Sequence, residues 1–170
     1  MLSSLSSQVV DLTSPGVCTY SLSVSSTLNQ SAKYAGKLMF DGRDDTCWSS
    51  DHGEGGQYIQ LVFKERVVLR EMAFMFQGGF VGQDATIYIG DTTVLSAMTA
   101  LSRLELIRDS NDLQTFSVPA PESAISSGGA VQPEGFKVVR IAFDCSTDLY
   151  GRVTLYHLRL IGRVAGRVDC

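Results

Sequence analysis

The chain has 170 residues, of which 44% are hydrophobic and 19% charged, with a formal net charge of -4. This length suits one domain with a sizeable core, and the composition is ordinary for a globular protein. The basic residues are scattered rather than clustered, which argues against a nucleic-acid surface, and no apolar run is long enough to span a membrane. We therefore expect neither nucleic acid nor a membrane among the partners.

The first sixteen residues are rich in serine and end in Ser14-Pro15-Gly16. They predict a loose leader over residues 1–16. Because they lack a basic start followed by an apolar stretch, they do not look like a secretory signal. The expected compartment is then reducing, and the four cysteines, none in CxxC spacing, are interpreted as free thiols. The alternative, if the protein is secreted, is that two of the cysteines form one disulfide bridge.

Alternating apolar residues predict strands with one buried face, beginning after the acidic turn 41–51 and the glycine-rich loop 52–56. The stretch 67–76 becomes apolar on both faces toward its end, which indicates a strand covered on both sides. The predicted strands, in chain order, are 57–63, 67–76, 86–89, 113–118, 136–143 and 153–161.

The connections between these strands are rich in glycine and proline. Paired glycines in 77–80 predict a tight turn. Residues 92–107 are ambiguous and predict one short helix or a loop, then a strand near 104–107. The stretch 119–135 predicts a long surface loop. Many short strands with little helix predict an all-β fold, an antiparallel β-sandwich or jelly roll.

Several short motifs in order give a resemblance to a known family. They are Phe40-Asp41-Gly42 through Trp48-Ser49-Ser50, Gln57-Tyr58-Ile59-Gln60-Leu61, Val139-Arg140-Ile141 and Leu158-Arg159-Leu160-Ile161-Gly162. Together they resemble the discoidin domain, also called the coagulation factor V/VIII type C domain. The resemblance implies a β-sandwich of the galactose-binding-domain-like type over residues 17–163, followed by a tail at 164–170.

A second set of motifs is similar to the nuclear receptor-associated protein family. It comprises Thr46-Cys47-Trp48, Phe76-Gln77-Gly78-Gly79-Phe80, Leu113-Gln114-Thr115-Phe116, Tyr150-Gly151-Arg152-Val153 and Tyr156-His157-Leu158-Arg159. Members of that family are small intracellular proteins described as repressing a testicular orphan nuclear receptor. The chain departs from the family in its longer leader and its extended 119–135 loop. The resemblance implies a cytoplasmic or nuclear protein with a protein partner.

The acidic turn is the best candidate for a cation site. Asp41, Asp44, Asp45 and Thr46 offer the oxygen ligands that calcium prefers. The resemblance implies roles for Asp41 and Thr46, since calcium-binding relatives often use the corresponding aspartate and threonine. The alternative is structural: Asp41 and Thr46 hydrogen-bond the turn and tie the chain together. The hypothesis is a structural calcium ion at Asp41, Asp44 and Thr46.

Three other side chains invite a functional interpretation. Trp48, the single tryptophan, is expected in the core rather than as an exposed platform for sugars. His52 is expected on a solvated loop, and His157 in a half-buried structural position on a strand. With two histidines, no GxSxG elbow and no Cys-His motif, nucleophilic catalysis has little support, and we expect no enzyme.

Two functions remain open from the sequence. The first is a non-enzymatic intracellular protein-interaction module that modulates transcription or complex assembly, as the family resemblance implies. The second is a lectin-like module that binds carbohydrate or another small polar ligand through loops at one end of the sandwich. His52, Phe80 and Arg152 are its candidate ligand-binding residues. An exposed cleft that joins these three side chains would favour the second function.

Overall fold

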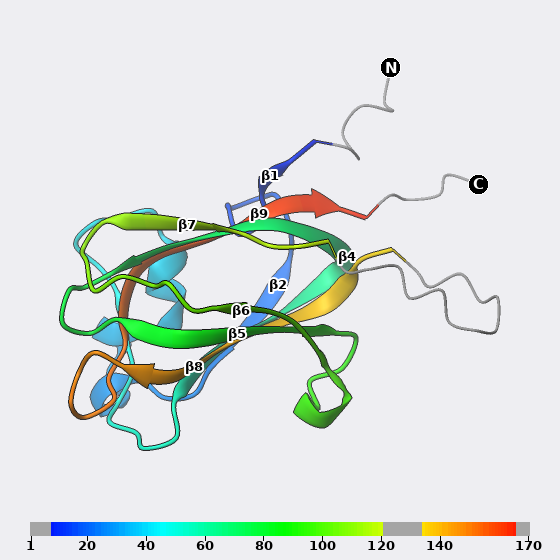
Figure 1. Ribbon diagram of the computed structural model, residues 1–170. Coiled ribbons are helices and arrows are strands. Elements are labelled where there is room, and N and C mark those ends of the chain that lie inside the picture. Colours follow the sequence, from blue (N-terminus) through cyan, green and yellow to red (C-terminus); the bar gives the residue numbers. More distant parts are fainter. Residues whose placement is uncertain (1–7, 121–133, 166–170) are drawn as a thin grey trace, which may run out of the picture.

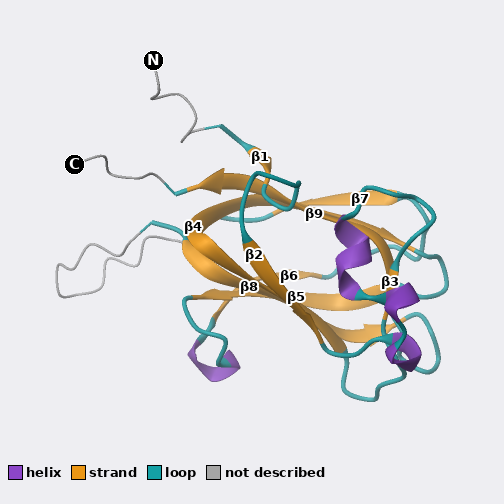
Figure 2. Ribbon diagram, turned by 180° about the vertical axis from the view of Figure 1, so that it is seen from behind, coloured by secondary structure: helices purple, strands orange, loops and turns teal. Residues whose placement is uncertain are grey.

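The computed structural model describes residues 8–120 and 134–165, and these residues form a strand-rich fold (Figure 1). The strands are β1 (Val10–Asp11), β2 (Tyr20–Val24), β3 (Trp48–Ser49), β4 (Gln57–Phe76), β5 (Gly82–Gly90), β6 (Thr99–Leu104), β7 (Leu113–Ser117), β8 (Phe136–Ser146) and β9 (Thr154–Val164). Four short 3-10 helices join them: η1 (Leu28–Gln30), η2 (Ala32–Tyr34), η3 (Gly36–Phe40) and η4 (Leu95–Ala97). The first three lie together beside β3, and η4 lies apart from them (Figure 2).

The long strand β4 belongs to both layers of the sandwich. Its first part pairs with β2 and β8, and its second part pairs with β9 and β7. The remaining strands extend these layers, because β8 pairs with β5, β5 with β6, and β9 with β1 and β3. Every one of these pairings is antiparallel. The predicted all-β antiparallel sandwich is confirmed.

The core lies between the two layers and is rich in aromatic rings. Phe74 and Phe76 of β4 face Phe143 of β8, with ring centroids 6.0 and 5.8 Å apart. Trp48 is fully buried, and its indole Nε1 donates a hydrogen bond of 3.0 Å to the Ser26 carbonyl oxygen. A buried indole needs such a partner. The prediction that Trp48 is a core residue is therefore confirmed.

The strand pattern differs from the predicted one in several places. The predicted strands 57–63 and 67–76 are one continuous strand, β4, with a shift in register between Val62 and Val67. In the ambiguous stretch, the strand is β6 rather than 104–107. On β9, strict alternation predicts Tyr156, Leu158 and Leu160 on one face. The structure instead buries Leu155, Leu158 and Leu160 and leaves Tyr156 half-buried, because the register against β4 shifts there. Alternation read from the sequence fails at such a bulge.

The leader also differs from its prediction where the structure describes it. β1 pairs with β9, Leu12 is fully buried, and the Leu12 amide donates to the Leu160 carbonyl oxygen at 2.8 Å. Residues 10–13 are thus part of the sandwich because they cover an apolar edge of β9. The predicted leader residues 1–7, most of the predicted 119–135 loop and residues 166–170 of the predicted tail lie outside the described residues.

Candidate binding site at one end of the sandwich

A cavity of about 600 Å³ opens between the β3–β4 loop and the β8–β9 loop. One wall consists of residues 52–56 of the first loop and Gln57 at the start of β4. The other consists of the end of β8 from Asp144 and of loop residues between Asp148 and Val153. Both loops lie at the same end of the sandwich as the β4–β5 turn (Figure 1). Loops on a rigid sandwich are where such folds usually bind their ligands.

Close backbone contacts between glycines hold the two loops together. The Gly53 amide donates to the Tyr150 carbonyl oxygen at 3.2 Å. Gly151 has a φ of +81°, and a β-carbon there would lie 2.3 Å from the Gly53 carbonyl oxygen. Gly56, with a φ of +82°, approaches the Phe143 carbonyl oxygen in the same way. Only glycine fits both the backbone angle and the space, so these glycines position the cavity walls.

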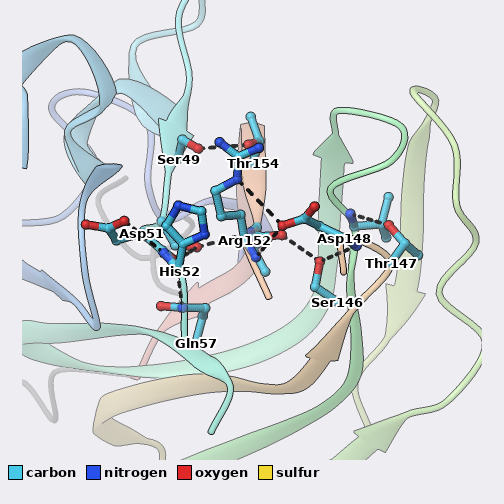
Figure 3. A network of polar contacts seen from close by, with 12 residues as sticks. Ser49, Asp51, His52, Gln57, Ser146, Thr147, Asp148, Arg152 and Thr154 are labelled. Carbon is cyan, nitrogen blue, oxygen red and sulfur yellow. Dashed lines mark hydrogen bonds and ion pairs between the residues drawn. The ribbon is translucent and has the colours of Figure 1, made fainter. Parts of the chain in front are cut away.

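Short polar side chains fix the conformation of the β8–β9 loop. The Ser146 hydroxyl donates to the Arg152 carbonyl oxygen at 2.5 Å and accepts from the Asp148 amide at 3.0 Å. The Asp148 carboxylate accepts from the Arg152 amide at 3.0 Å and lies 3.6 Å from Nε of the same residue (Figure 3). The Thr147 hydroxyl accepts from the Val81 amide at 2.9 Å. The loop is therefore held before any ligand arrives.

The rim of the cavity carries an exposed apolar tip. Leu149 is 91% exposed and Tyr150 is 64% exposed. The ring of Tyr150 meets the ring of His52 edge to face, with centroids 5.5 Å apart. Large apolar side chains held in water on a fixed loop are a feature of binding surfaces.

The chemistry of the cavity lining is acidic. Glu54, Asp144 and Asp148 contribute carboxylates, and none of the described lining residues is a lysine or arginine. Cys145, an exposed free thiol, also lines the cavity, and its Sγ lies 3.4 Å from Oδ2 of Asp84. Partial burial and this hydrogen bond raise the pKa of the Cys145 thiol. A thiol with a raised pKa is a poor nucleophile near neutral pH.

The three predicted ligand-binding residues are only partly brought together. His52 lines the cavity, but Phe80 and Arg152 do not. The Arg152 guanidinium lies over the Phe80 ring, 4.8 Å from its centroid, and its Nε has no hydrogen-bond partner among the described residues. Arg152 reaches the cavity indirectly, through Asp148. No single cleft of the described structure joins all three, and their role in binding stays a prediction.

The acidic turn lies elsewhere and is held by its own hydrogen bonds. The Thr46 hydroxyl donates to Asp41 at 2.5 Å, and the Arg43 amide donates to the other oxygen of Asp41 at 2.9 Å. Partial desolvation raises the pKa of Asp41, but these two hydrogen bonds and the Arg43 charge outweigh it and lower the pKa overall. Arg43 also pairs with Asp45, at 2.7 Å.

The predicted calcium ligands fit an ion only in part. Asp41 and Thr46 lie together, but Asp44 accepts a contact of 2.7 Å from Nε2 of His157 on β9. In the described part of the chain, no three His, Cys, Asp or Glu side chains converge as a metal cluster would require. Backbone carbonyls would have to supply most ligands. The hydrogen bonds agree with the structural interpretation of Asp41 and Thr46, and calcium binding stays a prediction.

His52 lies on an exposed loop as predicted, whereas His157 is structural as predicted but more buried than expected. His52 is exposed on the β3–β4 loop, where its amide donates to the Asp51 carboxylate at 2.9 Å. His157 is buried, with 8% of its surface exposed, and ties β9 to the acidic turn through Asp44. This tie joins residues 113 positions apart in the chain.

Comparison with known proteins decides the family. No family model matches the chain. The mouse nuclear receptor 2C2-associated protein is 34% identical over 146 residues, which cover 84% of this chain and 91% of the relative. The human protein of the same name is 33% identical over 150 residues, covering 86% and 94%. The chain belongs to the nuclear receptor 2C2-associated protein family. The resemblance seen in the sequence is thereby confirmed.

Solved structures similar to this family member share its fold. A chitosan-binding module of a Paenibacillus chitosanase/glucanase has a TM-score of 0.65 at 16% identity, covering 89% of this chain and 98% of its own. An F5/8 type C domain from Bacteroides fragilis has a TM-score of 0.62 at 18% identity, covering 94% and 98%. At such low identity the likeness shows the fold alone, and it confirms the discoidin-type sandwich.

Sequence reasoning missed the residues that build the cavity of this family member. Tyr150 stands out in the sequence only as part of a family motif, Leu149 belongs to no motif, and the contact between Gly53 and Gly151 has no signal in either loop alone. The available signal was a pair of glycine-containing loops, 52–56 and 148–152, each with one aromatic or imidazole ring. Their pairing depends on β3 and β9 being neighbours, which only the fold reveals.

Proposed function

We propose that the protein is a non-enzymatic protein-interaction module that binds a regulatory protein and modulates transcription or complex assembly. Family membership over most of the chain supports this function, since the relatives are named for association with nuclear receptor 2C2. A cytoplasmic or nuclear location belongs to the same proposal. Within residues 8–120 and 134–165, no helix is long and apolar enough to cross a membrane.

The exposed tip formed by Leu149 and Tyr150 is the observation that carries the proposal. Burying a fully exposed leucine contributes about 1.5–3 kcal/mol, so contact with this leucine on its preformed loop would stabilise a complex with a partner protein. Leu149 is 91% exposed and sits on the hydrogen-bonded β8–β9 loop. The partner is expected to cover this tip.

Affinity purification with a matched pair of variants tests the proposal. Leu149→Ser removes the apolar tip, and Val94→Ser removes another exposed apolar side chain, 56% exposed, from the segment before η4. A specific partner should be recovered with wild type and Val94→Ser and lost with Leu149→Ser. Recovery of the same proteins by all three chains would contradict the tip as the docking site.

The second candidate function is a lectin-like module. Structures similar to this chain include a family 32 carbohydrate-binding module from Clostridium perfringens in complex with galactose, with a TM-score of 0.60 at 13% identity. The cavity at the loop end, with His52 and Tyr150 on its rim, supports this candidate. A glycan array tests it directly. Binding of one glycan class, together with repeated failure to recover a protein partner, would reverse the ranking.

A further inference from the structure

The cavity carries more negative charge than its own cations neutralise. Asp148 is occupied by Arg152. Asp144 shares one guanidinium, Arg103, with Asp84 and Glu105, at distances of 3.3, 4.0 and 3.7 Å. One cation thus serves three carboxylates, which leaves an excess of negative charge beside the cavity.

Glu54 adds a further carboxylate, which no residue of the described structure neutralises. It is exposed on the β3–β4 loop and lines the cavity. Its carboxylate forms no hydrogen bond or ion pair with residues 8–120 or 134–165, whereas Asp144 and Asp148 each have an arginine. A cationic group of a ligand could pair with the Glu54 carboxylate. Desolvation of this carboxylate would cost little free energy, because it lies at the mouth of the cavity.

The aromatic rim offers a second element of cation recognition. Tyr150 is 64% exposed, and His52 supports its ring from one side through the edge-to-face contact of 5.5 Å. The face of a tyrosine ring attracts a guanidinium or ammonium group. The fold itself contains such pairs elsewhere, for example Arg140 over Tyr58 at 4.1 Å.

The exposed Leu149 side chain indicates which class of cationic ligand fits the cavity. Leu149 adjoins Tyr150 and lines the same cavity. A polypeptide can supply a cation and an apolar side chain a few ångströms apart, whereas a sugar hydroxyl face leaves the Leu149 side chain in contact with polar groups. The combination therefore favours a peptide segment that alternates basic and apolar residues.

We propose that this cavity binds an arginine-containing segment of a partner protein, with the guanidinium between Glu54 and the Tyr150 ring and an apolar neighbour on Leu149. The inference rests on the proposed protein-binding function and specifies the chemistry of its partner. The glycine contacts between the two loops hold the cavity in place, so little ordering cost opposes binding. Binding is expected to weaken as salt increases.

Fluorescence polarisation with a designed peptide tests this inference. The probe is a short labelled peptide of alternating arginine and leucine, and its control replaces each arginine by citrulline, which keeps the shape and removes the charge. The arginine peptide should bind about tenfold more tightly than the citrulline peptide. Glu54→Gln should remove most of that difference. Glu71→Gln, which neutralises an exposed carboxylate on β4, should leave it unchanged.

Each other outcome overturns the inference. Equal binding of the two peptides, or none at millimolar concentration, excludes recognition of the guanidinium. Equal weakening by Glu54→Gln and Glu71→Gln shows attraction to the overall negative charge rather than to the cavity. Chitotriose that displaces the arginine peptide at lower concentration assigns the cavity to a cationic sugar.

The failure of this inference is distinguishable from failure of the proposed function. If a partner is captured through Leu149 but Glu54→Gln does not weaken its binding, the interaction function stands and the arginine assignment is wrong. If no partner depends on Leu149, the proposed function itself fails. Circular dichroism of Glu54→Gln checks that the variant is folded, which its exposed loop position leads us to expect.

Discussion

The α-carbon of Gly151 packs directly against the carbonyl oxygen of Gly53. A β-carbon at Gly151 would lie 2.3 Å from that oxygen, and the Gly53 amide donates to the carbonyl of the preceding residue, Tyr150. This contact joins the β3–β4 and β8–β9 loops, which together form the cavity. The site therefore depends on two glycines about a hundred residues apart.

Gly151→Ala should destabilise the protein by at least about 2 kcal/mol, because it combines a strained positive φ with a backbone clash. Urea unfolding followed by circular dichroism measures the change. Gly79→Ala is the matched control, since Gly79 has a φ of +87° but no atom within 4 Å of its β-carbon position. A loss equal to that of Gly79→Ala would show that the contact with Gly53 contributes nothing.

Trp48→Phe should lower the free energy of unfolding by about 2–3 kcal/mol. The smaller ring leaves a cavity in the core, and the Ser26 carbonyl loses its indole donor. Thermal unfolding followed by circular dichroism gives the difference. Tyr150→Phe, at an exposed position, should change stability by less than about 0.5 kcal/mol. Similar losses in the two variants would contradict a core role for Trp48.

Asp41 should make the stability of the protein fall in acid. Its pKa is lowered in the folded state, so its stabilising contribution is present above the pKa of the unfolded chain and is lost as pH falls through the folded pKa. Asp41→Asn should cost about 0.5 kcal/mol near neutral pH, since the hydrogen bonds are exposed, and should flatten the acid decline below about pH 4.

Melting temperatures across this pH range compare wild type with Asp41→Asn. Glu71→Gln is the control, because it removes an exposed carboxylate that makes no described hydrogen bond. A decline in Asp41→Asn that stays parallel to wild type at every pH would exclude the lowered pKa as its cause.

Calcium bound at the predicted site of Asp41, Asp44 and Thr46 should raise the melting temperature by mass action, and Thr46→Val should abolish the rise. The measurement is a thermal shift in millimolar calcium against a chelator. Asp44→Asn tests the third predicted ligand. The rise in melting temperature should shrink in this variant if Asp44 binds the ion, and should persist if Asp44 only contacts His157. If neither calcium nor the chelator changes the melting temperature, calcium binding is excluded and the acidic turn has a structural role only.

The candidate site shows where prediction from sequence reaches its limit. His52 was singled out and does line the cavity, because a histidine in a glycine-rich loop is recognisable locally. Phe80 and Arg152 were also singled out, and they pack against each other beside the cavity. Asp44 was grouped with Asp41 because they are close in the chain, but its side chain reaches across to β9.

The fold class, the buried position of Trp48 and the family resemblance could be predicted from the sequence, since alternation, turn residues and short ordered motifs are local properties. The folded chain was needed to show that residues 10–13 join the sandwich and that β4 is one strand serving both layers. It also decided that Glu54, Tyr150 and Leu149 share one cavity. Such contacts depend on strand pairing between distant segments, and no local pattern encodes them.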